Sequence, residues 1–208
     1  MIDGKFDRNQ LASILGKHVE TLAWHYRDQL VGLDVANEAF AGMDGSLMAG
    51  PWQPLNDLYV FISFDSARAA NCPVIYNCFS KFEHHNLEHS RALYLLDNEI
   101  ANGIGIQLHL YESTWEIDLG RTEAFLIRIR DHGGWCRFSE VGVLASNDRL
   151  QADVYRAITQ LAIKYKDIVK EVITWGVRDP AGFRGNVTLF NNNGEPKPSC
   201  HAVMEELS

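Results

Sequence analysis

The sequence predicts an α/β fold with a parallel β-sheet, and three observations lead to this prediction. Short apolar runs alternate with amphipathic segments of helical length, which is the pattern of repeated strand–helix units. Polar side chains follow the carboxyl ends of the expected strands, as they do at the active-site face of an α/β barrel. No GxGxxG or P-loop motif follows the first expected strand, so a nucleotide-binding, doubly wound sheet lacks its usual support.

The first helix and the first strand are predicted from a change in the spacing of the apolar residues. Residues 10–28 carry apolar side chains at helical spacing, and residues 30–36 form a short apolar run that matches a buried strand. That run ends in Asn37 and Glu38. Residues 54–70 then return to helical spacing, and "PVIYN", residues 73–77, is typical of a second strand that ends in an amide, Asn77.

The remaining units repeat this order. A helix over 86–101 precedes the strand "GIGIQLHL", residues 103–110, which carries Gln107 and His109. A helix over 120–132 precedes the strand "WCRFSEVGV", residues 135–143, which carries Glu140. The last expected elements are a helix over 150–168, a strand over 171–177 that contains Trp175, and a helix from about residue 199.

The composition limits the classes of partner. The chain has 208 residues, of which 46% are hydrophobic, and we expect a single domain over residues 1–208. A net charge of −8 argues against nucleic acid and anionic membranes as partners. No apolar run approaches the ~20 residues of a membrane span, and the polar N-terminal segment lacks the apolar core of a signal peptide. The four cysteines form no CxxC pair, and we interpret them as free thiols.

Two glutamates at the ends of two parallel strands, Glu38 and Glu140, form a candidate catalytic pair. Hydrolysis of a glycosidic bond uses two carboxyl groups. One protonates the leaving oxygen, and the other attacks the anomeric carbon or activates water. A nearby anion also raises the pKa of a neighbouring carboxyl group, which keeps an acid protonated near neutral pH.

Five segments, in chain order, resemble the motifs of one known family. "LDVANEAF" is similar to W-D-V-V-N-E-A, "PVIYNCFS" to a strand ending in N-D-Y, and "NGIGIQLHL" to G-I-G-x-Q-x-H. "CRFSEVGV" resembles a T-E-L-D strand, and "VITWGV" with the later "PKPSCHAV" resembles the closing W-G-V and P-K-P-A-Y-x-A-V motifs. The family is glycoside hydrolase family 10, the retaining endo-1,4-β-xylanases, and the resemblance covers nearly the whole chain.

The resemblance implies a role for each matching residue. Glu38 would be the acid/base and Glu140 the nucleophile. The residues expected to contact xylan or xylo-oligosaccharides, or to orient the two carboxylates, are Asn37, Asn77, Gln107, His109, Trp175 and Arg184. His85 and His89 have the i, i+4 spacing of metal ligands. No third ligand accompanies them and the family needs no metal, so we expect no metal and no other cofactor.

The sequence departs from the family pattern at several positions. Cys78 and Phe79 stand where the motif has Asp and Tyr, and Gly142 replaces an acid that would orient His109. Leu33 and Phe183 each replace a Trp.

The larger departure is length, because the family's acid/base lies on the fourth of eight strands, whereas Glu38 follows the first strand of this chain. We therefore expect a partial (β/α)8 TIM barrel with strands equivalent to 4–8 and with the first three βα units missing. An open barrel leaves two strand edges and an apolar face unpaired. We therefore expect a homo-oligomer or association with a separate N-terminal half.

Three functions remain open at this point. The first is a retaining endo-1,4-β-xylanase. The alternative is a truncated, weakly active or inactive half-barrel that binds carbohydrate or serves as an assembly module. The third is another barrel glycosidase that uses the same pair of glutamates, because substrate specificity lies partly in the missing half. Relatives in the family are commonly secreted, but the sequence does not identify the compartment of this chain.

Overall fold

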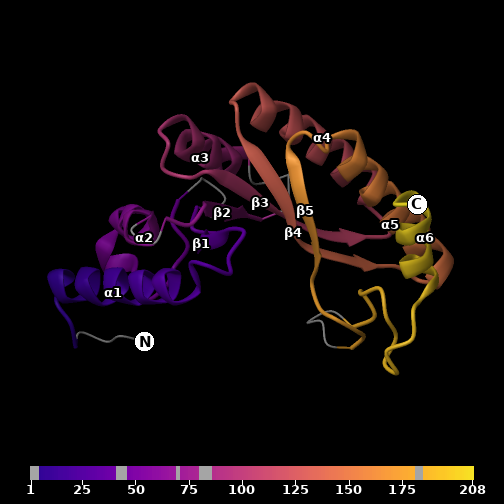
Figure 1. Cartoon of the computed structure of the whole chain (residues 1–208), viewed down its shortest axis with the longest axis horizontal. Helices are drawn as coiled ribbons and strands as arrows, with labels where there is room; N and C mark the ends of the chain where they lie inside the picture. Colours follow the sequence, from indigo (N-terminus) through magenta and orange to yellow (C-terminus); the bar gives the residue numbers. More distant parts are fainter. Residues whose placement is uncertain (1–4, 41–45, 69–70, 80–85, 181–184) are drawn as a thin grey trace. The chain divides into compact units, whose positions relative to one another are not determined.

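Figure 1 shows a computed structural model of the chain, which describes residues 5–40, 46–68, 71–79, 86–180 and 185–208. Strands and helices alternate along the chain, so the predicted α/β class is confirmed. The chain divides into two compact units, residues 1–79 with 83–105, and residues 80–82 with 106–208. The expectation of one domain over residues 1–208 stays a prediction.

The first unit holds two complete strands and the helices beside them. Its elements are α1 (Arg8–Tyr26), β1 (Leu33–Asn37), the 3-10 helix η1 (Gln53–Leu55), α2 (Leu58–Arg68), β2 (Val74–Cys78), α3 (Asn86–Asp97) and the first residues of β3 (Gly103–Tyr111). Strands β1 and β2 pair in parallel, with Leu33 opposite Val74 and Asn37 opposite Asn77. Helix α1 packs on α2, and α2 contacts β1.

Local contacts explain where α1 and β1 begin. Helix α1 begins at Arg8 rather than at residue 10 because Asp7 and Gln10 form a capping box, with reciprocal hydrogen bonds of 2.8 and 2.9 Å. Strand β1 begins at Leu33 rather than at residue 30 because the amide of Leu30 still bonds to the carbonyl of Tyr26. Gly32 then passes so close to β2 that an added Cβ would lie 2.6 Å from a side-chain carbon of Ile75.

The second unit contains the rest of β3 and the later βα units. Its elements are α4 (Trp115–Asp131), β4 (Trp135–Leu144), α5 (Asp148–Lys164), β5 (Val169–Thr174) and α6 (Pro198–Glu206). Strands β4 and β5 pair in parallel, and α5 packs against α6. Helix α4 begins at Trp115 rather than at residue 120. Its first turn carries acidic side chains, and the hydroxyl of Thr114 donates to Asp118 at 2.7 Å.

The strands follow one another in the order β1-β2-β3-β4-β5, so β1 and β5 are the edge strands of the described sheet. Val172 and Ile173 are consecutive in β5 and are 48% and 41% exposed. Because consecutive side chains point to opposite faces of a strand, β5 is open on both faces. This matches the sequence expectation of uncovered apolar strand surface.

The cysteines and the helix lengths bear on two expectations from the composition. Cys72, Cys78, Cys136 and Cys200 are free thiols, as predicted. None of the helices in the described part of the chain is both long and apolar enough to cross a membrane.

Candidate active site

The first unit brings Asn37, Glu38 and Asn77 together at the carboxyl ends of β1 and β2. The amide of Asn77 donates to the side-chain oxygen of Asn37 at 2.7 Å, and the backbone N–H of Glu38 donates to the carbonyl of Asn77 at 2.9 Å. Asn77 is buried, whereas Asn37 is exposed. The parallel register therefore places three of the predicted site residues together at the carboxyl ends of β1 and β2.

Glu38 leaves the strand in an unusual backbone conformation. Its φ of 51° lies in the left-handed region, which costs a residue with a Cβ about 1 kcal/mol or more. Two hydrogen bonds from backbone N–H groups hold the segment. One is the bond from Glu38 to Asn77, and the other runs from the N–H of Phe40 to the hydroxyl of Tyr76 at 2.9 Å. Glu38 therefore lies directly after the end of β1 and does not continue the extended backbone of the strand.

A cavity of about 450 Å³ lies along β1 in the first unit, and we call it the β1 groove. Every residue from Leu33 to Ala39 lines it, which indicates that the strand's edge, rather than one of its faces, borders the cavity. Its other walls come from α1, α2 and the segment between β1 and α2. They are Leu15, His18, Val19, Leu22, Met48, Ala49, Gly50, Trp52, Tyr59 and Ser63.

The second unit places Glu140 beside His109. The Nε2 atom of His109 lies 3.2 Å from Oε2 of Glu140, and both side chains are 12% exposed. The ring of Trp175, 6.2 Å away between centroids, meets the His109 ring edge-on. Trp175 follows β5, and its backbone N–H donates to the carbonyl of Val141 on β4 at 2.8 Å. His109 on β3 and Glu140 on β4 therefore form a polar contact, with the half-exposed indole of Trp175, the residue after β5, beside it.

The other predicted site residues of this unit differ in what the structure describes. Gln107 lies on β3 two positions before His109, which places it on the same face of the strand, and it is buried. A Cβ added at Gly142 would lie 3.8 Å from Nδ1 of His109 and 3.6 Å from Val187, so this position faces the far side of the imidazole. Arg184 and Phe183 lie outside the described residues.

Glu38 and Glu140 belong to different units, Glu38 to the first and Glu140 to the second. Their pairing across one glycosidic bond stays a prediction, as do the roles of the residues around them.

A buried carboxyl group that the sequence reasoning missed lies behind the Glu38 turn. Glu88 on α3 is fully buried and accepts hydrogen bonds from the Tyr76 hydroxyl at 3.0 Å and from the N–H of Phe79 at 3.2 Å. Burial raises the pKa of Glu88 to about 7, the two hydrogen bonds oppose that rise, and the nearby Glu38 adds to it. The available signal was helical spacing, since Glu88 shares a stripe of α3 with the buried Ala92 and Leu95.

The raised pKa of Glu88 predicts a pH-dependent free energy of unfolding. An acid with a higher pKa in the folded state stabilises the fold fully below pH 4.5, and this stability is lost as the pH rises to about 7. The loss amounts to about 3 kcal/mol. In urea unfolding at pH 5 and pH 8, we therefore expect Glu88→Gln to be more stable relative to the unmodified chain at pH 8 than at pH 5. Glu20→Gln, which removes an exposed carboxyl from the same unit, is the matched control.

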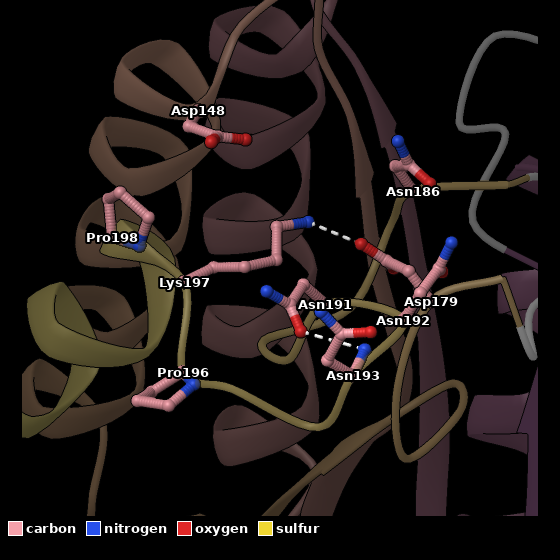
Figure 2. Close-up of a pocket in the computed structure, with 9 residues that line it drawn as sticks. All are labelled: Asp148, Asp179, Asn186, Asn191, Asn192, Asn193, Pro196, Lys197 and Pro198. Atoms are coloured by element: carbon pink, nitrogen blue, oxygen red, sulfur yellow. Dashed lines mark hydrogen bonds and ion pairs between the residues drawn. The ribbon is translucent and has the colours of Figure 1, made fainter.

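A second cavity, of about 340 Å³, lies in the second unit between the loop after β5 and the start of α6 (Figure 2). Asp179 and Lys197 line it and form an ion pair of 2.7 Å, with side chains 4% and 7% exposed. Asp179 also accepts hydrogen bonds from the N–H and the hydroxyl of Thr188, both at 3.0 Å. These contacts anchor the loop that follows Trp175.

The described ranges contain no group of three or more His, Cys, Asp or Glu residues arranged to hold a metal ion. His89 is buried on α3, and His85 falls outside the described residues.

Comparison with known proteins gives a consistent match. The sequence model described as glycosyl hydrolase family 10 matches residues 1–206. Endo-1,4-beta-xylanase A of Caldicellulosiruptor saccharolyticus is 26% identical over 222 residues, which cover 91% of this chain and 64% of the relative. Endo-1,4-beta-xylanase 2 of Claviceps purpurea is 28% identical, with 95% of this chain and 61% of the relative covered. The chain spans less than two thirds of the length of these two relatives.

A solved structure shows the same fold. Xylanase 10B from Thermotoga petrophila RKU-1, solved in complex with xylobiose, superposes with a TM-score of 0.85 at 23% identity. The match covers 98% of this chain and 67% of the solved chain. Nearly complete coverage on one side and partial coverage on the other agree with the prediction of a partial barrel.

Proposed function

Because the chain belongs to glycosyl hydrolase family 10, we propose that it hydrolyses β-1,4-xylosidic bonds in xylan or xylo-oligosaccharides. The names of the relatives support this substrate class, and xylobiose is bound in one structural neighbour. The single observation that carries the proposal is the contact of Glu140 with His109 beside the half-exposed Trp175. A carboxylate that contacts a neighbouring imidazole, next to an aromatic ring that can pack on a sugar, is suited to attack the anomeric carbon.

The proposed mechanism is a retaining double displacement. Glu140 attacks the anomeric carbon while Glu38 gives its proton to the leaving glycosidic oxygen, and a covalent glycosyl–Glu140 ester results. Glu38 then removes a proton from water, whose oxygen attacks the same carbon and releases Glu140. Two inversions return the sugar to its original configuration.

The remaining predicted residues would bind and orient the sugar. Asn37 would hydrogen-bond the 2-hydroxyl of the reacting sugar, a contact that strengthens in the transition state. Asn77, which bonds to the Asn37 side chain, would line the cleft beyond the cleaved bond. Gln107 and His109 would orient the two carboxylates, and Trp175 would pack on the sugar ring. Arg184 would lie in the adjacent loop.

The function is tested by release of reducing sugar from xylan, together with proton NMR of the first product formed from a xylo-oligosaccharide. We expect sugar release from xylan and a β-anomer as the first product. A first product with the α-configuration would contradict the retaining mechanism. No sugar release over a range of chain concentrations would contradict the hydrolase assignment.

Gly142→Asp is expected to raise the rate of xylan hydrolysis. The Cβ of the new side chain would lie 3.8 Å from Nδ1 of His109, and its carboxylate could accept a hydrogen bond from that nitrogen, which would fix the imidazole beside Glu140. Orienting partners of this kind change rates by roughly tenfold or more. Steady-state rates on xylan measure the effect, and Gly142→Asn is the control of equal size without charge. A rate for Gly142→Asp no higher than that of Gly142→Asn would contradict the expectation.

We also propose that the β1 groove receives an extended strand from another polypeptide, either a separate N-terminal half or a second copy of this chain. The supporting observations are the position of β1 at the edge of the sheet and the apolar groove along its whole length. An edge strand offers unpaired backbone groups, and apolar walls add favourable burial when a strand is added.

Sedimentation tests this association. We expect the chain to self-associate at micromolar concentration or to bind a polypeptide that contains three further βα units of a relative. Leu22→Lys, which places a charge in the groove, is expected to weaken that association. Ile14→Lys is the matched control, since both side chains lie on α1 and are 41% exposed, but Ile14 does not line the groove. A chain that remains a stable monomer and does not bind the added polypeptide would refute the proposal.

A second candidate function is a half-barrel that binds xylan or assembles with a partner but turns over slowly. The observation that favours it is the fully buried Cys78, which stands where the family motif has a carboxylate. Burial and the neighbouring Glu88 raise the pKa of the Cys78 thiol well above its usual range, so the thiol cannot replace that acid. Xylan binding in affinity electrophoresis without sugar release would favour this candidate.

A further inference from the structure

A chain of hydrogen bonds links the buried Glu88 to the turn that carries Glu38. The hydroxyl of Tyr76 donates to Oε1 of Glu88 at 3.0 Å and accepts from the N–H of Phe40 at 2.9 Å. Phe40 is two residues after Glu38, whose φ of 51° is strained. The rings of Tyr76 and Phe40 also contact each other, with centroids 5.8 Å apart. One hydroxyl therefore connects a carboxyl on α3 to the backbone just beyond the proposed acid/base.

We propose that Glu88 is a positioning residue that fixes the Glu38 turn through the Tyr76 hydroxyl. The inference rests on the proposed function only for its effect on rate, because the geometry of the turn exists without substrate. Since all four residues belong to the first unit, the link depends on nothing outside that unit.

The charge of Glu88 sets the strength of this link. A hydrogen bond to an ionised carboxylate is shorter and stronger than one to a neutral acid, and it polarises the donor hydroxyl so that it accepts more strongly in turn. Ionised Glu88 therefore tightens the bond from Phe40 to Tyr76, and protonation loosens it. The pKa of Glu88, raised to about 7 by burial, places this change near neutral pH.

The groups around Glu88 come from several elements. Tyr76 and Cys78 lie on β2, and their pKa values are raised beyond the neutral range, so neither group titrates with Glu88. Glu38, which follows β1, repels an ionised Glu88. The guanidinium of Arg91 on α3 lies 5.5 Å from the centre of the Phe40 ring. It places a positive charge near Phe40, the residue at the other end of the hydrogen-bond chain from Glu88.

The proposal is tested first without substrate, by following the amide signal of Phe40 in nitrogen–proton NMR spectra from pH 5 to pH 9. In the unmodified chain, we expect this signal to shift with an inflection near pH 7. Glu88→Gln and Tyr76→Phe should both abolish the inflection, the first by removing the charge and the second by cutting the link. Arg91→Gln is the matched control and should retain the inflection. Arg91 lies over the Phe40 ring but takes no part in the hydrogen bonds from Phe40 to Tyr76 and from Tyr76 to Glu88.

The second measurement is the pH profile of kcat and KM on a xylo-oligosaccharide. We expect Glu88→Gln to lower kcat roughly tenfold above pH 7 with little change in KM, since a displaced acid affects chemistry more than binding. An inflection at Phe40 that persists in Tyr76→Phe, or a kcat profile unchanged in Glu88→Gln, would overturn the proposal. If the unmodified chain lacks activity on xylan, the proposed function fails, and the amide titration still decides the role of Glu88. If Glu88→Gln does not fold, the comparison of Tyr76→Phe with the unmodified chain decides it.

Discussion

Glu140→Ala is expected to lower xylan hydrolysis by on the order of 10⁴-fold or more, because no other group then forms the covalent intermediate. The methyl group leaves space for a small external anion at the position of the lost carboxylate. Added azide should therefore restore part of the rate and yield a glycosyl azide of inverted configuration, since only one displacement takes place.

Glu38→Ala is expected to behave differently, because it removes a proton donor rather than the nucleophile. Hydrolysis of xylan should fall by roughly 10²- to 10⁴-fold. Formation of the covalent intermediate from an aryl xyloside with an acidic phenol should be nearly unchanged, since such a leaving group departs without a proton. Azide should then give a glycosyl azide of retained configuration.

The two variants together assign the roles of nucleophile and acid/base. Steady-state kinetics measure the loss of rate, and NMR measures the configuration of the azide products. Glu116→Ala, at an exposed glutamate on α4, is the control. An inverted azide from the Glu38 variant and a retained azide from the Glu140 variant would reverse the assignment. Activity of Glu140→Ala equal to that of the unmodified chain would remove Glu140 from the mechanism.

Lys197→Met is expected to lower the free energy of unfolding of the second unit by about 3–5 kcal/mol, because it leaves the Asp179 carboxylate buried without its cation. The pair is 2.7 Å long, and both side chains are less than a tenth exposed. The two hydrogen bonds from Thr188 remain in the variant but do not supply a compensating charge. A loss of this size is a large part of the 5–15 kcal/mol typical of a domain.

Urea unfolding measures the loss, with Lys166→Met, at an exposed lysine of the same unit, as the control. The double variant Lys197→Met/Asp179→Asn should recover part of the stability, since the amide removes the buried charge while retaining an acceptor for Thr188. A loss below about 1 kcal/mol for Lys197→Met would show that the pair behaves as a surface ion pair.

The order and type of the elements could be predicted because both depend on local patterns. The period of the apolar residues separates helices from strands, and it correctly predicted the five strands that the structure describes, with helices between them. The ends of the elements were predicted less well. The start of β1 depends on how α1 ends at Tyr26, and the start of α4 depends on acidic residues in its first turn.

The candidate site was predictable where neighbouring strands bring its residues together. Asn37 and Asn77 contact each other because the parallel strands β1 and β2 bring their carboxyl ends to one edge of the sheet. His109 and Glu140 also contact each other, but Glu140 lies inside β4 (Trp135–Leu144) rather than at its end. Glu88 was not predicted, because its partners lie on other elements. Tyr76 precedes it by 12 residues, and Phe40 precedes Tyr76 by 36.

Sequence periodicity and motif order alone therefore establish the α/β class, the family, and the two strands on or after which Glu140 and Glu38 lie. The packed fold adds what no local pattern contains. It buries Glu88, which raises the pKa of that carboxyl because a charge loses its hydration there. It also joins Glu88 to the Glu38 turn through Tyr76, and it leaves an open groove along the edge of β1. These features arise from contacts between residues distant in the chain, whose solvation is set only when the elements pack together.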